Sequence, residues 1–150
     1  MKITLTMEGF KALQKTMKNM AGKQVEDVKK ETYAAGLDAQ REAKNNLKDM
    51  GSWDLGNLAN TILAEKGDSG LTCEVGPTAG YGPAVEYGTK PHFPPMDALE
   101  GWAKRHGFDS AWPICKAISE RGLPAKPFLL PAYLVVEEPF FKRLVKILEK

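Results

Sequence analysis

The chain has 150 residues, of which 43% are hydrophobic and 27% charged, so one folded domain over residues 1–150 is the simplest organisation and needs no metal or disulfide. Lys and Arg total 21 against 19 Asp and Glu, and the net charge of +2 argues against a dedicated duplex-DNA binder. No apolar run approaches the ~20 residues of a membrane span, and the opening MKITLTMEGF has no apolar core of signal-peptide length. We therefore expect no membrane contact and assembly in a cytoplasm.

The first part of the chain predicts a strand followed by two helices. Apolar and polar residues alternate from Ile3 to Met7, which is typical of a half-buried strand. A helical face ending near Gly22 follows, with apolar residues at spacings of three and four: Phe10, Leu13, Met17 and Met20. A longer helix is predicted near residues 24–48, and it carries four small residues: Ala34, Ala35, Gly36 and Ala39. Small side chains let another element approach the backbone closely, either in the same subunit or in a neighbour.

The middle of the chain predicts a β-hairpin. Residues 58–66 are expected to begin as a helical turn and to continue as a strand, and apolar residues alternate again over 71–75. The four residues GDSG at 67–70 form the connection expected between two hairpin strands. Residues 76–95 are dense in Gly, Pro and aromatic residues, which favours an ordered connection with fixed turns over a flexible linker.

Helices dominate the prediction after residue 95. Two of them are expected to stop near Gly107 and Gly122, and Pro113 suits the first turn of the second. The last segment places four apolar residues on one helical face: Phe141, Leu144, Val145 and Leu148. Pro139 lacks an amide hydrogen and clashes with the preceding turn, so two helical pieces with a break near 137–138 are predicted. The elements together predict an α+β fold with a long N-terminal helical region packed on a small, mostly antiparallel sheet, and additional C-terminal helices.

The sequence carries no convincing catalytic, cofactor or metal motif. Phosphate-loop, dinucleotide-binding and nucleophile-elbow patterns are absent. The two histidines, His92 and His106, could in principle join Cys73 and Cys115 in a zinc site, or one of them could activate Cys115 as a nucleophile. The spacing supports neither arrangement, and both cysteines are better explained as reduced packing residues. We expect no catalytic residue, no cofactor and no bound metal.

Aromatic and basic residues after residue 101 raise the alternative of nucleic-acid binding. Trp102 and Trp112 could stack on bases beside three cationic side chains: Lys104, Arg105 and Lys116. Aromatic residues at helical spacing more often fill a core or a protein interface. Packing is therefore the preferred interpretation of both tryptophans.

Two short motifs, taken together, resemble a known family. The first is YGPAVEYGT at 81–89, which contains Glu86, Tyr87, Gly88 and Thr89. The second lies in GLPAKPFLLPA at 122–132, and it matches at five positions: Pro127, Phe128, Leu129, Pro131 and Ala132. The order and spacing resemble the tail-component family of long-tailed, lambda-like bacteriophages, in which a Glu-aromatic-Gly-Thr box precedes a Pro-Phe-Leu-x-Pro-Ala box that opens the last helix. The helical region over 95–121 is longer here than in compact members of that family.

This resemblance implies a structural virion protein of the tail or neck, which completes the tail or joins it to the head. The implied partners are further copies of the chain in a hexameric ring, the tail terminator or tail tube protein, and a head-side connector protein. DNA would pass through the ring without sequence-specific recognition. Two alternatives stay open, a small phage or prophage enzyme such as a nuclease or cell-wall hydrolase, and a DNA-binding regulator.

The chemistry of the boxes suits a structural corner. Gly88 can adopt backbone conformations closed to other residues, Thr89 can form local hydrogen bonds, and Tyr87 is expected to bury its ring while its hydroxyl reaches a partner. Pro127 and Pro131 restrict the entry to the last helix, and two apolar anchors are expected beside them: Phe128 and Leu129. These seven residues, together with Glu86, are the candidate motif or interface positions.

Overall fold

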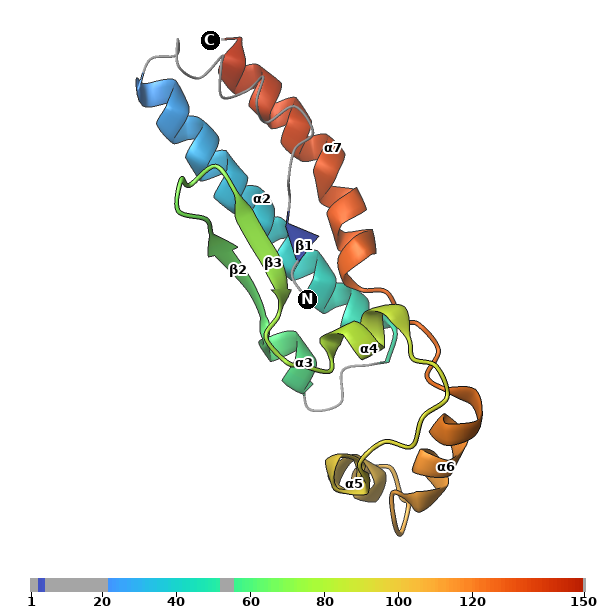
Figure 1. The fold of residues 1–150 in the computed structure, drawn as a ribbon. Coiled ribbons are helices and arrows are strands. Elements are labelled where there is room, and N and C mark those ends of the chain that lie inside the picture. The colour runs from blue at the N-terminus through green and yellow to red at the C-terminus, as the bar shows by residue number, and fades with distance from the viewer. Residues whose placement is uncertain (1–2, 5–21, 52–55, 150) are drawn as a thin grey trace. The chain divides into compact units, whose positions relative to one another are not determined.

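The computed structural model describes residues 3–4, 22–51 and 56–149, and it divides the chain into two compact units (Figure 1). Unit 1 falls within Met1–Gly80 and Phe128–Lys150, and unit 2 is Tyr81–Pro127. The predicted helical face at 10–20 and the strand residues Leu5 and Met7 lie outside the described residues. A single domain over 1–150 stays a prediction.

Two long helices form the body of unit 1. Helix α2 spans Gly22–Asp49 and α7 spans Leu129–Leu148. They run side by side in opposite directions (Figure 1). The end of α2 lies beside the start of α7, where the Asn46 amide donates a hydrogen bond of 3.0 Å to the carbonyl oxygen of Phe128. Farther along, Arg143 of α7 forms an ion pair with Glu31 of α2. The stripe predicted on α2 is buried: Val28, Thr32, Ala35, Gly36, Ala39, Ala43 and Leu47.

A three-stranded antiparallel sheet packs on α2. Its strands are β1 (Ile3–Thr4), β2 (Ile62–Lys66) and β3 (Cys73–Pro77), in the order β1-β3-β2. The short helix α3 (Asn57–Asn60) leads into β2, so the predicted turn-then-strand and the predicted hairpin are both confirmed. Gly36 is the point of closest approach, because a Cβ atom there would lie 2.1 Å from the sulfur of Cys73. The small residues of α2 therefore serve packing within the subunit.

The prediction that Pro139 splits the last helix is wrong. Helix α7 is continuous through this residue. A proline removes one amide donor, which normally pairs with the carbonyl four residues earlier. Here that residue is Val135, whose side chain is 62% exposed, so water can reach this side of the helix. Burial of Val136 and Phe140 against α2 holds the helix together on both sides of the proline.

Unit 2 contains three helices and a core of its own. They are α4 (Gly82–Tyr87), α5 (Met96–Arg105) and α6 (Trp112–Arg121). Ala103, Ala111 and Cys115 are fully buried, and three partly buried side chains pack against them: Met96, Leu99 and Ile114. The two predicted helices after residue 95 are confirmed, with Pro113 in the first turn of α6. Helix α4 was not predicted, because its Gly-Pro-rich start was interpreted as a turn.

The architecture is therefore α+β, as predicted, with α7 and a small antiparallel sheet both packed on α2. Among the described residues, no helix combines the length and the apolar character needed to cross a bilayer.

Candidate functional site

Unit 2 joins the two sequence motifs at one backbone corner. Thr89, which ends the first motif, forms an antiparallel bridge with Leu123 in the segment that leads into the second. The amide of Thr89 donates to the Leu123 carbonyl at 2.9 Å, and the amide of Leu123 donates back to the Thr89 carbonyl at 3.2 Å. The amide of Lys126 adds a hydrogen bond of 2.8 Å to the carbonyl of Val85 in α4. Segments more than thirty residues apart are thus held together by main-chain hydrogen bonds, and we call this the corner.

Two glycines allow the backbones to meet at the corner. Gly88 has φ 71° and Gly122 has φ 72°, both in the left-handed region that favours glycine. A Cβ atom on Gly88 would lie 2.5 Å from the carbonyl oxygen of Leu123, and one on Gly122 would lie 2.0 Å from the carbonyl oxygen of Thr89. Each glycine therefore makes room for the main chain of the other motif. This mutual requirement explains why a glycine stands next to the bridge in both segments.

The side chains of the first motif divide between the interior and the surface. Glu86 is only 2% exposed, whereas the ring of Tyr87 is 64% exposed. The expected burial of the Tyr87 ring is therefore wrong. Helix α4 ends at Tyr87, immediately before the left-handed Gly88, and this ending leaves the ring on the surface. The side chain of Thr89 stays at the corner, where its hydroxyl oxygen accepts a second hydrogen bond from the Leu123 amide at 3.2 Å.

The second motif crosses the boundary between the two units. Pro127 is exposed and is the last residue of unit 2. Phe128 and Leu129 begin unit 1, with side chains 0% and 3% exposed, so both expected anchors are buried. Pro131 is partly buried in the first turn of α7. The Pro-Phe-Leu motif thus fixes the start of α7, while the residues just before it belong to the corner.

The residues considered for chemistry do not form a site in the described part of the chain, where no group of three potential metal-ligating side chains occurs. Cys73 belongs to unit 1 and Cys115 to unit 2, and both are buried free thiols. Burial raises the pKa of the Cys73 thiol, which disfavours the reactive thiolate. His92 and His106 are exposed, and the Nδ1 atom of each lies 2.9 Å from a nearby main-chain carbonyl oxygen.

The two tryptophans differ in their surroundings. The ring of Trp102 stacks on His106 with 4.0 Å between ring centroids, and it also stacks on Phe108. Trp112 is 51% exposed, with the ammonium group of Lys116 5.3 Å from its ring centroid. Trp102 therefore packs against neighbouring rings, whereas Trp112 lies on the surface of unit 2.

Sequence reasoning missed one backbone contact and one surface feature. It identified both motifs but did not predict that Thr89 would pair with Leu123, although Gly88 and Gly122 gave a signal because both precede possible bridge residues. It also placed Phe141, Val145 and Leu144 on one face of the last helix. Leu144 is in fact buried against α2, while Phe141 and Val145 are 39% and 49% exposed on another side.

A comparison with known families matches residues 11–88 to the model described as "Bacteriophage HK97-gp10, putative tail-component". The match covers just over half of the chain and includes α2, the hairpin and the first motif up to Gly88. No curated protein and no solved structure matches the chain significantly. With more than half of its length matched, including α2 and the hairpin of β2 and β3, the chain belongs to the HK97 gp10-like family of bacteriophage tail components.

Proposed function

We propose that this tail component completes the tail, or joins it to the head, as one subunit of a ring around the DNA path. The proposed ring is a hexamer that lies in the tail or neck of the virion and contacts the tail terminator or tail tube protein and a head-side connector protein. DNA would pass through without sequence-specific recognition, which agrees with a net charge of only +2.

The observation that carries this proposal is the corner of unit 2. Its main chain is fixed by reciprocal hydrogen bonds and two left-handed glycines, yet it presents the ring of Tyr87 to solvent. A rigid backbone with an exposed aromatic side chain is a favourable anchor for a protein contact, because little conformational entropy is lost on binding. Unit 2 exposes further large apolar side chains that could extend such a contact: Tyr81, Phe93, Trp112 and Leu123.

Head-to-tail contacts between identical subunits close into a ring when the rotation between neighbours permits closure. Such a ring acts mechanically, by setting the order of assembly and surrounding the DNA, and it requires no reaction. The proposal therefore includes the absence of catalysis. Nuclease and peptidoglycan hydrolase assays with Mg²⁺, Mn²⁺ or Zn²⁺ test this part, and turnover that is lost on changing His92, His106 or Cys115 would contradict it.

The assembled virion provides the direct test. A photocrosslinking amino acid at Tyr87 should capture a neighbouring copy or a tail partner in virions, and imaging should place the chain in a multi-copy ring between head and tube. The same amino acid at Leu63, which is 41% exposed on β2, is the matched control. Absence of the protein from virions, together with normal head-tail joining after gene deletion, would refute the proposal.

A further inference from the structure

Helix α7 carries a second apolar face besides the one buried against α2. Four of its exposed side chains recur at helical spacing and form what we call the α7 stripe: Leu130, Leu134, Phe141 and Val145. Each is between 39% and 57% exposed. Since successive helical residues turn by about 100°, the stripe lies roughly 130° around α7 from its buried side, and both faces can be occupied at once. A second apolar face on a helix indicates a contact with another protein surface.

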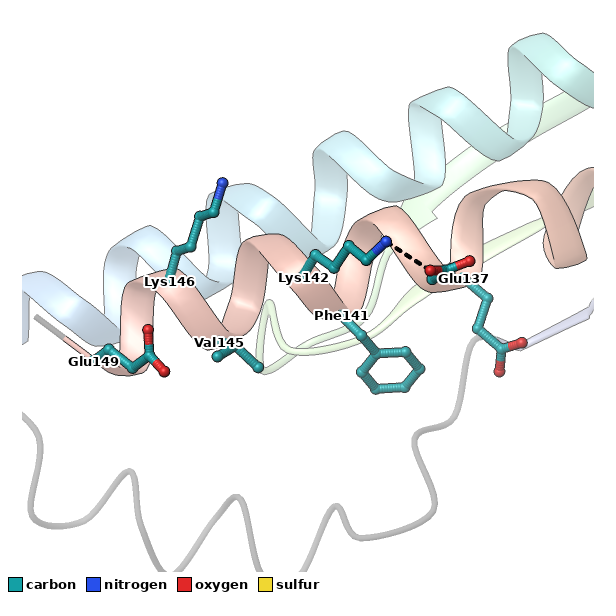
Figure 2. Close-up of a pocket in the computed structure, with 7 residues that line it drawn as sticks. Glu137, Phe141, Lys142, Val145, Lys146 and Glu149 are labelled. Carbon is teal, nitrogen blue, oxygen red and sulfur yellow. Dashed lines mark ion pairs between the residues drawn. The ribbon is translucent and has the colours of Figure 1, made fainter.

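Charged side chains flank the second half of the α7 stripe. Figure 2 shows Phe141 and Val145 projecting to the same side of α7, and the described residues that border the shallow hollow there all belong to this helix. Glu138 and Lys142 lie one turn apart along one edge of the stripe and form an ion pair of 2.6 Å. Both side chains are largely exposed. This edge therefore carries a negative and a positive group in a fixed order along the helix.

We propose that the α7 stripe binds the α7 stripe of a second copy of this chain, with the two helices antiparallel. The stripe is nearly symmetrical about the point between Pro139 and Phe140, because Leu134 and Val145 lie equally far from it along the helix. A two-fold axis through that point brings Leu134 of each copy to the level of Val145 in the other. The two Phe141 rings are then about 4.5 Å apart along the helix direction and can pack on each other.

The charged edge selects the antiparallel arrangement. The two-fold axis places the same edge of each stripe side by side, with the order of the charges reversed. Glu138 of one copy is then level with Phe141 of the other, next to the Lys142 ammonium group. Two equivalent intermolecular ion pairs can therefore form, and the four side chains alternate in sign. A parallel pair would instead place Glu138 of each copy beside Glu137 of the other, and repulsion between the carboxylates disfavours it.

This contact differs in kind from the contacts of the proposed ring and does not rest on them. It is isologous, since the same surface is used by both copies, whereas a ring needs head-to-tail contacts between different surfaces. It also involves only unit 1, while Tyr87, the anchor proposed for the ring, belongs to unit 2. A contact through one helix face of each copy is at the small end of stable interfaces, so trapping by a covalent bond is the suitable measurement.

Disulfide trapping in the full chain tests both the pairing and its direction. Leu134→Cys chains mixed with Val145→Cys chains under mild oxidation should give a covalent dimer of one chain of each kind, identified by its mass. Neither variant alone should give a dimer, because two like positions are about 16 Å apart along the helix direction, too far for a disulfide. The native Cys73 and Cys115 are 0% exposed and do not compete.

Leu63→Cys is the matched control for a cysteine at an exposed apolar position. Leu63 is 41% exposed on β2, outside the α7 stripe. Mixed with Val145→Cys chains, this variant should stay monomeric. A mixed dimer that formed as fast with Leu63→Cys as with Leu134→Cys would show random collision in place of the proposed contact.

Charge reversal in both cysteine chains tests the edge of the stripe. Glu138→Lys would face Lys142 of the second copy with a like charge, so the mixed disulfide should form about tenfold more slowly at low salt. Adding Lys142→Glu to the same chains should restore the original rate. An unchanged denaturation midpoint verifies the fold, because both side chains are exposed and their ion pair contributes little to stability.

Three results would overturn the proposal. A disulfide formed readily by Leu134→Cys alone would identify a parallel pair. Absence of the mixed dimer would show that a second copy does not cover the α7 stripe. Equal rates for the original and the singly reversed chains would show that Glu138 and Lys142 do not set the arrangement. A failure of Tyr87 to crosslink in virions would count against the ring and would leave this contact intact.

Discussion

The two units differ in what fixes their structure. Unit 1 is stabilised mainly by side-chain burial: Phe128, Ile62 and Leu47 are fully buried, and long helices bring distant parts of the chain together. Unit 2 has a small core, and its corner is set by main-chain hydrogen bonds and by glycines in conformations that other residues disfavour. Substitutions that remove side-chain volume should therefore destabilise unit 1, and substitutions that add side-chain volume at the corner should destabilise unit 2.

The largest effect is expected from Phe128→Ala in unit 1. Deleting a fully buried ring removes its hydrophobic contribution and leaves a cavity, so the free energy of unfolding should fall by about 3–5 kcal/mol. Chemical denaturation gives the total change, and hydrogen exchange should locate the loss of protection in α2 and α7. Phe93→Ala, where the ring is 56% exposed, is the control and should change stability little. An unchanged midpoint for Phe128→Ala would mean that burial does not govern unit 1.

A smaller loss is expected when a methyl group is added to the corner. Gly122→Ala combines a left-handed backbone with a Cβ atom 2.0 Å from the Thr89 carbonyl oxygen, so it should destabilise unit 2 by about 2 kcal/mol or more. Gly107 also has a positive φ, 80°, but nothing within 4 Å of the added atom. Gly107→Ala should therefore cost only the conformational part, about 1 kcal/mol. Equal losses of exchange protection in the two variants would show that close approach at the corner is unimportant.

The smallest effect is expected from Thr89→Val. This change removes the hydroxyl acceptor but keeps the shape of the side chain and both main-chain bonds to Leu123, so it should cost about 0.5–1 kcal/mol. The amide of Leu123 should exchange faster, whereas Thr89→Ser should behave like the original protein. If both variants exchange alike, the hydroxyl does not support the corner.

The same contrast explains what the sequence could reveal. Periodicity predicted α2 and the hairpin because burial in unit 1 follows the spacing of apolar residues such as Val28, Ala35 and Leu47. The corner depends instead on the pairing of Thr89 with Leu123, a contact across a long loop that leaves no periodic signal. The motifs therefore contain residues of the corner, including Gly88, without revealing which of them touch.

The continuous helix at Pro139 has a related cause. Local propensity predicts a break, but packing against α2 outweighs one lost hydrogen bond on the exposed side of the helix. The exposure of Tyr87 was missed because an aromatic residue within a motif suggests burial, whereas its position at the end of α4 places it on the surface.

The order of the two units along the chain has a consequence for folding. Unit 1 is built from pieces on both sides of unit 2, and Asn46 reaches its partner Phe128 only after eighty-two further residues. The contacts of α2 with α7 therefore close over a long loop, whereas its contacts with the sheet and all the hydrogen bonds of the corner, which lie between Val85 and Lys126, close over shorter ones and can form earlier. A folding chain can therefore complete the corner before its longest helix has packed on α7.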